Sequence, residues 1–477
     1  MIFTTYEYIL FLFIVFVLHW TVPEKWRKEL LIVASYVFYC TWDWRFGFLL
    51  LGLSLFNWAY ANRVLSRNYS TGAIAAGVAV NLGALVYFKY TKFILVNAAD
   101  VAQLFGSTWQ PSFGDIILPL GLSFFTFQGI AYLVDVAGGE EPLHSLRDFL
   151  LFKALWPQLV AGPIIRLSEI REQIEGTRTL DYPDVAEGSR RIVFGFFKKW
   201  VLADNLAPYV DSIFGAATPP HFADAVVGAI GFGLQIYFDF SAYSDIAIGT
   251  ARLFGFRFPE NFNWPYAAVS PQDFWNRWHM TLSRWIRDYL YTPYAFALRR
   301  RPRLAPTGLL VAMALCGLWH GAQWTFVLWG VWHGLLLLLN QSPIGRRFFV
   351  APDRRASVSM FHRVAASAVT LILVFAGWIF FRATSIHQAM VFFRTILTFH
   401  GGLHPALIRE NVVLFVGAMF AAVLSAQLLR GFLSRRPDFA RRVIPAPGLL
   451  RPLAYALIII AIIVFEPSSR AFIYFQF

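Results

Sequence analysis

The stretch APTGLLVAMALCGLWHGAQWTFVLWGVWHGLLLLLN, residues 305–340, decides the fold of this 477-residue chain. It is apolar almost throughout, and it lies between two arginine-rich segments, Arg299–Arg303 and Arg346–Arg355. Because basic segments favour the cytoplasmic side of a membrane, both ends of the stretch are predicted to lie on that side. The chain must then enter the membrane and return, and the sequence places the turn at Gly317 or at His320–Gly321.

The length of the first arm sets the depth of His320. Residues 305–319 would form ~22 Å of helix, which is less than the roughly 30 Å hydrocarbon core of a bilayer. His320 is therefore predicted to lie at membrane depth rather than in bulk water. An ionisable group is costly to bury there, and such a group usually faces a cavity or a pathway.

The composition places the whole chain in a membrane. Hydrophobic residues make up 57% of it and charged residues only 14%, far less charge than a soluble chain of this length exposes. Backbone groups in lipid must pair internally, so the long apolar runs are predicted to be helices. The predicted fold is an all-α polytopic membrane protein, a single membrane domain over residues 1–477 with no soluble domain between its spans.

The apolar runs give the predicted helical segments. Two of them, 117–137 and 146–165, contain internal Pro and Gly and are expected to be re-entrant or broken helices. The full set is 6–21, 29–42, 45–63, 72–97, 117–137, 146–165, 190–204, 222–254, 305–340, 361–382, 411–430 and 449–466.

The net charge of +13 is carried largely by short basic segments between the apolar runs. This is the pattern of cytoplasmic loops, so no nucleic-acid partner is expected. Two further basic segments, Glu24–Lys28 and Arg435–Arg442, are also placed inside, which puts the N-terminus and the tail Glu466–Phe477 outside. The two cysteines, Cys40 and Cys316, lie in apolar runs without disulfide or metal-type spacing, so no metal site is predicted.

His320, in the segment CGLWHGAQW at residues 316–324, is the first candidate for chemistry. Gly317 and Gly321 allow close backbone approach, Trp319 and Trp324 would form flat apolar walls, and Gln323 adds a hydrogen-bonding group. A neutral imidazole there could accept a proton from a hydroxyl nucleophile. The alternative is a buried histidine that only hydrogen-bonds to a neighbouring helix.

His279 is the second candidate, in FWNRWHMTLSRWIRDY at residues 274–289. A continuous helix here would bring Trp278, Trp285 and Tyr289 near one face. One interpretation is an amphipathic helix at the membrane interface, with an aromatic belt and snorkelling arginines. Another is the lining of a cytoplasmic entrance at which arginine binds a phosphate-bearing donor. The candidate lining residues of this segment are Asn276, Trp278, Arg287 and Asp288.

Acidic residues inside the run 222–254 form a third group. Asp239 and Asp245 are candidate lining residues, and Asp245 and Arg252 lie two helical turns apart on about the same face. A purely structural network through a neighbouring helix explains them equally well. Asp135, His333 and Glu466 are interpreted as structural. The sequence has no Gly-x-Ser-x-Gly elbow, no Walker-type loop and no His-Glu-x-x-His.

Five stretches together resemble the membrane-bound O-acyltransferase family, in the branch of bacterial alginate O-acetyltransferase membrane subunits. They are LPLGLSFFTFQ (118–128), QLVAGP (158–163), YFDFSAYSD (237–245), FWNRWHMTLSRWIRDYLYTP (274–293) and LWHGAQWTFVLWG (318–330), so the core motifs cover about 118–340. The sequence departs from this branch after Pro293, where Tyr-Ala-Phe-Ala-Leu and the Arg299–Arg303 run replace a Gly-containing turn.

The resemblance implies roughly eleven transmembrane helices, with re-entrant or interfacial helices, around a central tunnel. It implies that His320 is the catalytic histidine and that His279 is the second motif position. It implies no bound cofactor, a cytoplasmic thioester donor such as acetyl-CoA, and an acceptor reached from outside through a periplasmic polysaccharide acetyltransferase partner. The expected location is the bacterial inner membrane, in contact with lipid, with both termini in the periplasm.

Three hypotheses for function follow. The first is an O-acyltransferase in which His320 acts as a general base, with His279 or Gln323 available to assist an oxyanion. The second is a transporter or flippase for a lipid-linked sugar, to which the intramembrane charges and broken helices would belong. The third is a non-catalytic subunit that anchors the assembly of an exported polysaccharide.

Overall fold

The structure is a computed structural model that describes residues 3–67, 69–114, 116–301, 303–350, 358–433, 450–465 and 470–473. Within these ranges all regular secondary structure is helical and no strand occurs, which confirms the all-α prediction. The chain divides into two compact units. The first comprises the described parts of 1–192 and 243–260, and the second those of 193–242 and 261–473.

The first unit is built from short and medium helices, several of which begin at polar capping residues. Asp43 accepts the backbone N–H of Arg45 at the start of α3, and Ser145 accepts that of Asp148 at the start of α7, so the first turn of each helix is satisfied. The helices are α1 (Tyr6–Thr21), α2 (Arg27–Cys40), α3 (Trp44–Tyr60), α4 (Thr71–Leu85), α5 (Thr91–Leu104), α6 (Leu122–Ala137), α7 (Leu146–Ala154), α8 (Trp156–Leu159) and α9 (Leu167–Glu175).

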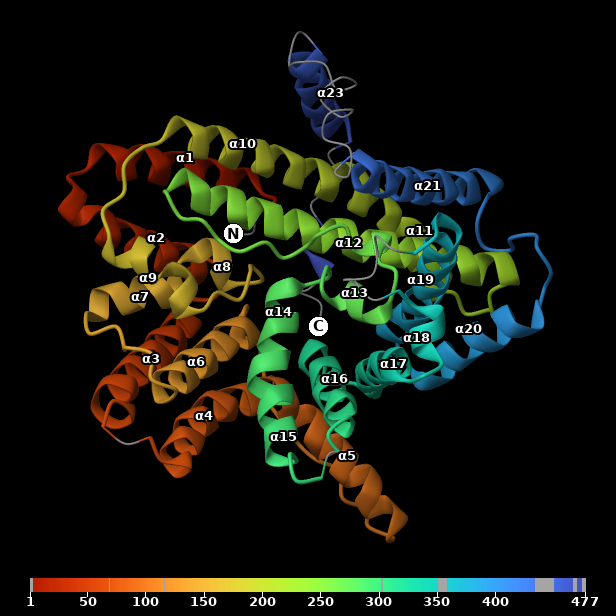
Figure 1. The fold of residues 1–477 in the computed structure, drawn as a ribbon, viewed down its shortest axis with the longest axis horizontal. Helices are drawn as coiled ribbons and strands as arrows, with labels where there is room; N and C mark the ends of the chain where they lie inside the picture. The colour runs from red at the N-terminus through yellow and green to blue at the C-terminus, as the bar shows by residue number, and fades with distance from the viewer. Residues whose placement is uncertain are drawn as a thin grey trace. The chain divides into compact units, whose positions relative to one another are not determined.

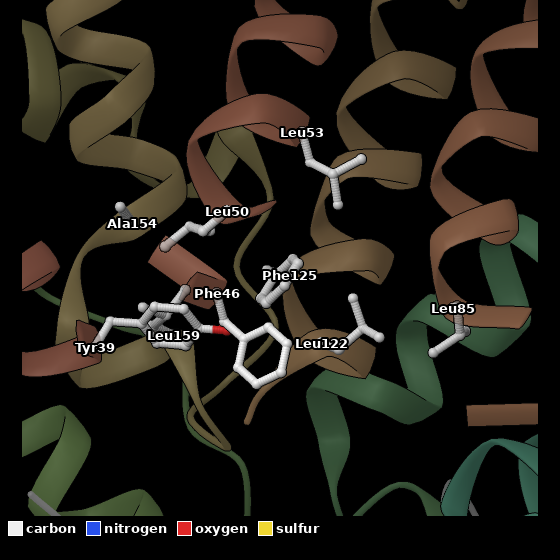
Figure 2. Packing of buried hydrophobic residues seen from close by; sticks show 9 residues of the cluster. All are labelled: Tyr39, Phe46, Leu50, Leu53, Leu85, Leu122, Phe125, Ala154 and Leu159. Carbon is white, nitrogen blue, oxygen red and sulfur yellow. The ribbon is translucent and has the colours of Figure 1, made fainter. Parts of the chain in front are cut away.

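A hydrophobic cluster joins α2, α3, α4, α6, α7 and α8 of this unit. Figure 2 shows its nine side chains, with Phe46, Leu50 and Leu53 from α3 close to Leu122 and Phe125 from α6. Because lipid is as apolar as these side chains, the cluster stabilises the unit through close van der Waals packing. Its members are Tyr39, Phe46, Leu50, Leu53, Leu85, Leu122, Phe125, Ala154 and Leu159.

The two segments predicted to be broken differ from each other. In 146–165 the break is confirmed, because α7 ends at Ala154 and α8 covers only Trp156–Leu159. In 117–137 the prediction of a broken helix is wrong, while the re-entrant alternative stays a prediction. Residues before Gly121 are not helical, and α6 then runs without interruption through Gly129, because Pro119 and Gly121 precede the helix rather than interrupt it.

The second unit contains the remaining helices, while α10 (Tyr182–Phe196) and α12 (Phe222–Leu253) contribute residues to both units. Two π-helical segments, Phe197–Ala203 and Arg287–Tyr291, extend α10 and α14. The other helices are α11 (Asp204–Phe214), α13 (Pro271–Trp275), α14 (Met280–Ile286), α15 (Thr292–Ala297), α16 (Thr307–His320), α17 (Trp324–Gln341), α18 (Gly345–Phe348), α19 (Met360–Arg382), α20 (Ile386–Thr398), α21 (Glu410–Leu433) and α23 (Leu450–Val464).

The deciding stretch 305–340 forms a helical hairpin, in which α16 and α17 lie side by side (Figure 1). The chain reverses at residues 321–323, so the predicted turn at His320–Gly321 is confirmed and the alternative at Gly317 is wrong. Gly317 is inside α16, where it lets the two helix backbones touch. A Cβ at Gly317 would lie 2.1 Å from the Phe326 carbonyl oxygen, and one at Gly330 would lie 2.1 Å from that of Met313.

Four helices within the described residues are long and apolar enough to cross a membrane: Thr71–Leu104, Phe222–Leu253, Met360–Arg382 and Glu410–Gln427. Thr71–Leu104 and Glu410–Gln427 are mostly exposed apolar surface, as expected of helices that face lipid. The larger number of spans implied by the family resemblance stays a prediction. The predicted basic segment Arg435–Arg442 and Glu466 lie outside the described residues.

The backbone contact between α16 and α17 generates a stability prediction. Gly317→Ala and Gly330→Ala should each lower the free energy of unfolding by about 1–3 kcal/mol, because the new methyl group overlaps a carbonyl of the partner helix. Thermal unfolding of the detergent-purified protein, followed by tryptophan fluorescence, measures the change. Gly52→Ala in α3 is the matched control, since nothing lies within 4 Å of the added carbon. Equal melting temperatures for Gly330→Ala and Gly52→Ala would contradict the close packing.

Candidate active site

His320 is the last residue of α16, directly before the turn of the hairpin. Its side chain is buried, as predicted, and aromatic rings from three helices surround it. The imidazole centre lies 4.9 Å from the ring of Trp319, 5.1 Å from that of Trp329 in α17 and 5.3 Å from that of Phe381 in α19. The Trp329 ring stands at 90° to the imidazole. Packing on several sides holds His320 in one orientation, as a positioned proton acceptor requires.

His279 lies at a break between two helices. The chain leaves α13 at Trp275 and enters α14 at Met280, and His279 has φ 42° and ψ 54°. The predicted continuous helix over 274–289 is therefore wrong. A left-handed conformation is uncommon for histidine, and such strain persists only where surrounding contacts hold it. Trp278 and Trp285 are also buried, so the predicted interfacial aromatic belt is wrong for these two residues.

Asn261 holds this break in place. Its backbone carbonyl accepts the Met280 N–H at 2.9 Å, and its side-chain Oδ1 accepts the N–H and the hydroxyl of Thr281 at 3.3 and 3.0 Å. The same Oδ1 lies 3.1 Å from His279 Nδ1. Because a backbone N–H can only donate, Oδ1 is an acceptor and the proton between these two residues sits on His279 Nδ1. Neutral His279 therefore presents Nε2 as an acceptor, which suits a base better than an oxyanion donor.

The structure brings the two predicted histidines to one aromatic cluster. The ring of Trp319 lies 6.3 Å from that of His279 and 4.9 Å from that of His320. Trp278, another predicted lining residue, is buried against Trp378 at 4.9 Å. Hence the two motifs, separated by some forty residues of sequence, meet across Trp319.

A cavity of about 410 Å³ lies between the segment that follows His279 and the hairpin that carries His320, and neither histidine is among its lining residues. One wall consists of α13, α14 and the segment Arg287–Tyr291, and the other of α16 and α17. Met280 lines it directly after His279, and Cys316 lines it four residues, or about 6 Å of helix rise, before His320. The lining comprises Gln272, Trp275, Asn276, Met280, Leu282, Ser283, Arg284, Ile286, Arg287, Tyr291, Leu309, Ala312, Met313, Cys316, Leu337, Asn340 and Gln341.

The cavity is polar at the end away from His320. Asn340 and Gln341 close α17, and Leu309 lies in the first turn of α16, so this end faces the basic segments that flank the hairpin. Arg287, a predicted lining residue, donates to Asp288 at 2.7 and 3.2 Å. The hydrogen bonds to Asp288 raise the pKa of the Arg287 guanidinium above its ordinary value, so it carries a full positive charge.

The remaining predicted residues have other surroundings. Gln323 is exposed at the start of α17. Trp324 is 53% exposed, so it does not form the predicted buried wall beside His320. Asp239 is buried and bonds to Lys199 at 2.7 Å and to the Ile473 N–H at 2.8 Å. These bonds give Asp239 a structural role. The predicted role of Asp239 in lining a tunnel stays a prediction.

Asp245 and Arg252 both connect α12 to α10. Asp245 lies 3.6 Å from Arg191, and Arg252 donates to Asp184 at 3.0 Å. The interpretation of a network through a neighbouring helix is therefore confirmed, while a lining role for Asp245 stays a prediction.

Two residues near the histidines, His333 and Asn261, were not singled out as site residues from the sequence. His333 on α17 is buried with its ring 5.0 Å from that of Trp329 and 5.2 Å from that of Trp275. Asn261 lies in a loop and carries no motif signal. Only the antiparallel pairing of α16 with α17 reveals that His333 and His320 pack on the same tryptophan, since they lie on different helices.

The fold and the site define an all-helical membrane protein in which two buried histidines lie in segments whose neighbouring residues line a cavity. Comparison with known proteins identifies the family to which this membrane protein belongs. Residues 141–364 match the model of the membrane-bound O-acyltransferase family. The probable alginate O-acetylase of Pseudomonas aeruginosa is 39% identical over 87% of this chain and 79% of its own length, and that of Pseudomonas putida is 35% identical over 98% of both. The peptidoglycan O-acetyltransferase of Helicobacter pylori is 33% identical over 80% of this chain and 74% of its own.

The chain belongs to the membrane-bound O-acyltransferase family. It is a membrane enzyme that transfers an acyl group from an acyl donor, and the first of the three hypotheses is the one that the family supports.

The contacts of Asn261 lead to a prediction for this activity. Asn261→Leu should reduce acyl transfer roughly a hundred-fold, because it releases the left-handed backbone and the ring orientation of His279. Turnover of a labelled acyl thioester by the purified variant is the measurement, with the melting temperature as a check on folding. Asn205→Leu is the control, since Asn205 donates to the carbonyls of Trp200 and Val201 in the same unit. Full turnover by Asn261→Leu would show that His279 needs no such support.

Proposed function

We propose that this enzyme moves an acetyl group from a cytoplasmic thioester, acetyl-CoA, to an exported polysaccharide, directly or through a periplasmic acetyltransferase partner. The observation that carries the proposal is the cavity of about 410 Å³ that is lined by Ala312 and Cys316 of α16, the helix that ends at buried His320. The names of the relatives, an alginate O-acetylase and a peptidoglycan O-acetyltransferase, support acetyl as the group and a polysaccharide as the acceptor.

The cavity fits the arm of a thioester donor. Its volume is in the usual range for small-molecule sites, roughly 300–1,000 Å³, and its walls are largely apolar. Arg284 and Arg287 lie at the polar part of the lining, and Arg299–Arg303 flanks that end of the hairpin. In this arrangement the phosphates of coenzyme A stay at the cytoplasmic rim beside the arginines, and the pantetheine arm carries the thioester towards Cys316 and His320.

The chemistry assigned to His320 is general-base catalysis. The imidazole takes the proton of an acceptor hydroxyl as its oxygen attacks the thioester carbonyl, and a tetrahedral oxyanion forms. Collapse of the oxyanion breaks the carbon–sulfur bond, the acyl ester forms, and the thiolate takes up the proton from the imidazolium. His279, with Nε2 as an acceptor, is a second proton acceptor near the same tryptophan.

The proposed setting is the bacterial inner membrane. The chain forms a single domain of roughly eleven spanning helices around a tunnel, the basic segments lie inside, and both termini lie in the periplasm. A tunnel of this kind lets a cytoplasmic thioester react with an outside acceptor while coenzyme A stays in the cytoplasm.

The role of His320 is tested by substitution. His320→Ala and His320→Gln should each lower acetyl transfer by about 10²–10⁴-fold, because the positioned proton acceptor is lost. The assay is transfer from labelled acetyl-CoA to polysaccharide or to the partner, with detergent-purified, folded protein. His387→Ala, on the exposed face of α20, should retain wild-type activity. Undiminished transfer by both His320 variants would remove the general-base assignment and favour a transport or assembly role for the chain.

The cavity is tested separately from the histidine. Ala312 is buried in α16 and lines the cavity, so Ala312→Phe should raise the KM for acetyl-CoA about ten-fold or more while affecting kcat less. Leu315→Phe, one turn along the same helix but 44% exposed, is the control and should leave both constants unchanged. An unchanged KM in Ala312→Phe would mean that the donor does not use this cavity.

A further inference from the structure

Two arginines of the first unit lie side by side without a counter-ion. Arg27 begins α2, and Arg178 lies in the segment between α9 and α10. The guanidinium of Arg27 donates to the backbone carbonyl of Arg178 at 2.9 Å, while that of Arg178 donates to the carbonyl of Gln173 at 2.5 Å. Both side chains are half-buried. These contacts fix where the two positive charges lie, but carbonyls do not neutralise them.

Aromatic rings support both guanidinium groups. That of Arg27 lies 5.0 Å from the ring centre of Trp20, and that of Arg178 lies 4.1 Å from the ring centre of Phe256. Gly255, with φ +77°, leaves room for Arg178, since a Cβ there would lie 3.2 Å from its Cδ. The rings and the backbone therefore hold the two guanidinium groups in place. This reduces the side-chain conformational entropy that would be lost when a ligand binds.

The charges of this pair are not balanced by the protein. Among the described residues, no carboxylate lies within the 4.0 Å of an ion pair from either guanidinium, and the buried Nε of each has no hydrogen-bond partner. Asp148, a nearby carboxylate, is bound by Lys28 at 2.7 Å. By contrast, ion pairs neutralise Arg147, Arg171, Arg190, Arg191, Arg252 and Arg257 of the same unit.

The energetics of the pair point to a missing anion. Burial and the neighbouring Arg27 lower the pKa of the Arg178 guanidinium to about 10, and the smaller, opposing effects of Asp148 and Glu24 do not offset them. Two like charges in a partly desolvated place are unfavourable unless an opposite charge joins them. Guanidinium groups bind phosphate oxygens with charge-assisted, often paired hydrogen bonds.

We propose that Arg27 and Arg178 form a binding site for a phosphate group at the cytoplasmic surface of the membrane. Trp26, next to Arg27, is 55% exposed, and Lys25 lies 5.8 Å from its ring centre. Exposed tryptophan beside basic residues is typical of the depth of lipid headgroups. The phosphate of an anionic phospholipid is therefore one source, and soluble phosphate is the other. The site is independent of the acyl-transfer chemistry.

The experiment is a ligand titration read by thermal unfolding. Delipidated full-length protein in neutral detergent is heated with increasing short-chain phosphatidylglycerol, with phosphatidylcholine of the same chain length, or with inorganic phosphate. We expect phosphatidylglycerol to raise the melting temperature saturably, and Arg27→Gln or Arg178→Gln to raise the half-saturating concentration about ten-fold or more. Arg147→Gln, which removes a neighbouring arginine that is already paired with Glu29, is the control and should respond like wild type.

The outcomes separate the sources and test the site. Equal stabilisation by inorganic phosphate and phosphatidylglycerol identifies soluble phosphate, whereas a response to the lipid alone identifies the headgroup. Without added anion, Arg27→Gln should melt no lower than Arg147→Gln, because its loss relieves repulsion with Arg178. Should the glutamine variants not fold, Arg27→Lys, which keeps the charge but loses the planar fork, should still show weakened half-saturation. A wild-type response that neither Arg27 nor Arg178 substitutions alter overturns the proposal, whatever the acyltransferase activity.

Discussion

The arrangement of the active site depends on the backbone contact between α16 and α17. Gly317 and Gly330 leave no space between the two helices for a Cβ, because each faces a carbonyl oxygen of the other helix. The contact sets the register of the hairpin, and the register places Trp329 and His333 of α17 beside His320 at the tip of α16. In a bilayer, where lipid is as apolar as leucine, close packing of small residues is a main force between helices. The surroundings of His320 therefore depend on van der Waals contact between the two helices.

A second constraint acts on His279. Its left-handed backbone interrupts the segment 274–289 and turns Trp278 inward, where it packs on Trp378. Asn261 compensates for the strain by accepting from Thr281 and contacting the imidazole with the same oxygen. One amide thus determines backbone geometry, ring orientation and tautomer together. Strain of this kind at a candidate site residue is what pre-organisation of an active site requires.

Buried charges follow one rule through most of the described chain. Lys199 bonds to Asp204 and Asp239, Arg191 and Arg252 pair with acidic partners, and these ion pairs connect α10 and its π-helical extension to neighbouring segments. Removing one partner of such a pair would leave an uncompensated buried charge, which costs several kcal/mol. In the first unit, fully buried Lys153 donates to the Phe125 carbonyl and has no carboxylate partner among the described residues, so a buried cation of this kind is not by itself a ligand site. Arg27 and Arg178 differ because two like charges lie together, and the proposed phosphate balances them.

Much of this protein follows from its sequence alone. Hydrophobic runs predict most of the long apolar helices, because a backbone in lipid has to be helical, but they miss the shorter helices α9, α11 and α20. The basic segments predict that 305–340 enters the membrane and returns, while the choice between a turn at Gly317 and one at His320–Gly321 stayed open. Residue type and motif spacing identify His320 and His279 as the candidates. The sequence did not predict the break at His279, the inward position of Trp278 or the exposure of Trp324. It also did not predict that Asn261 supports the break or that His333 packs on Trp329. These depend on a left-handed backbone, on one loop amide and on the register between two helices. Each of these features arises from contacts between residues that are distant in the sequence. The local periodicity of the sequence does not predict such contacts.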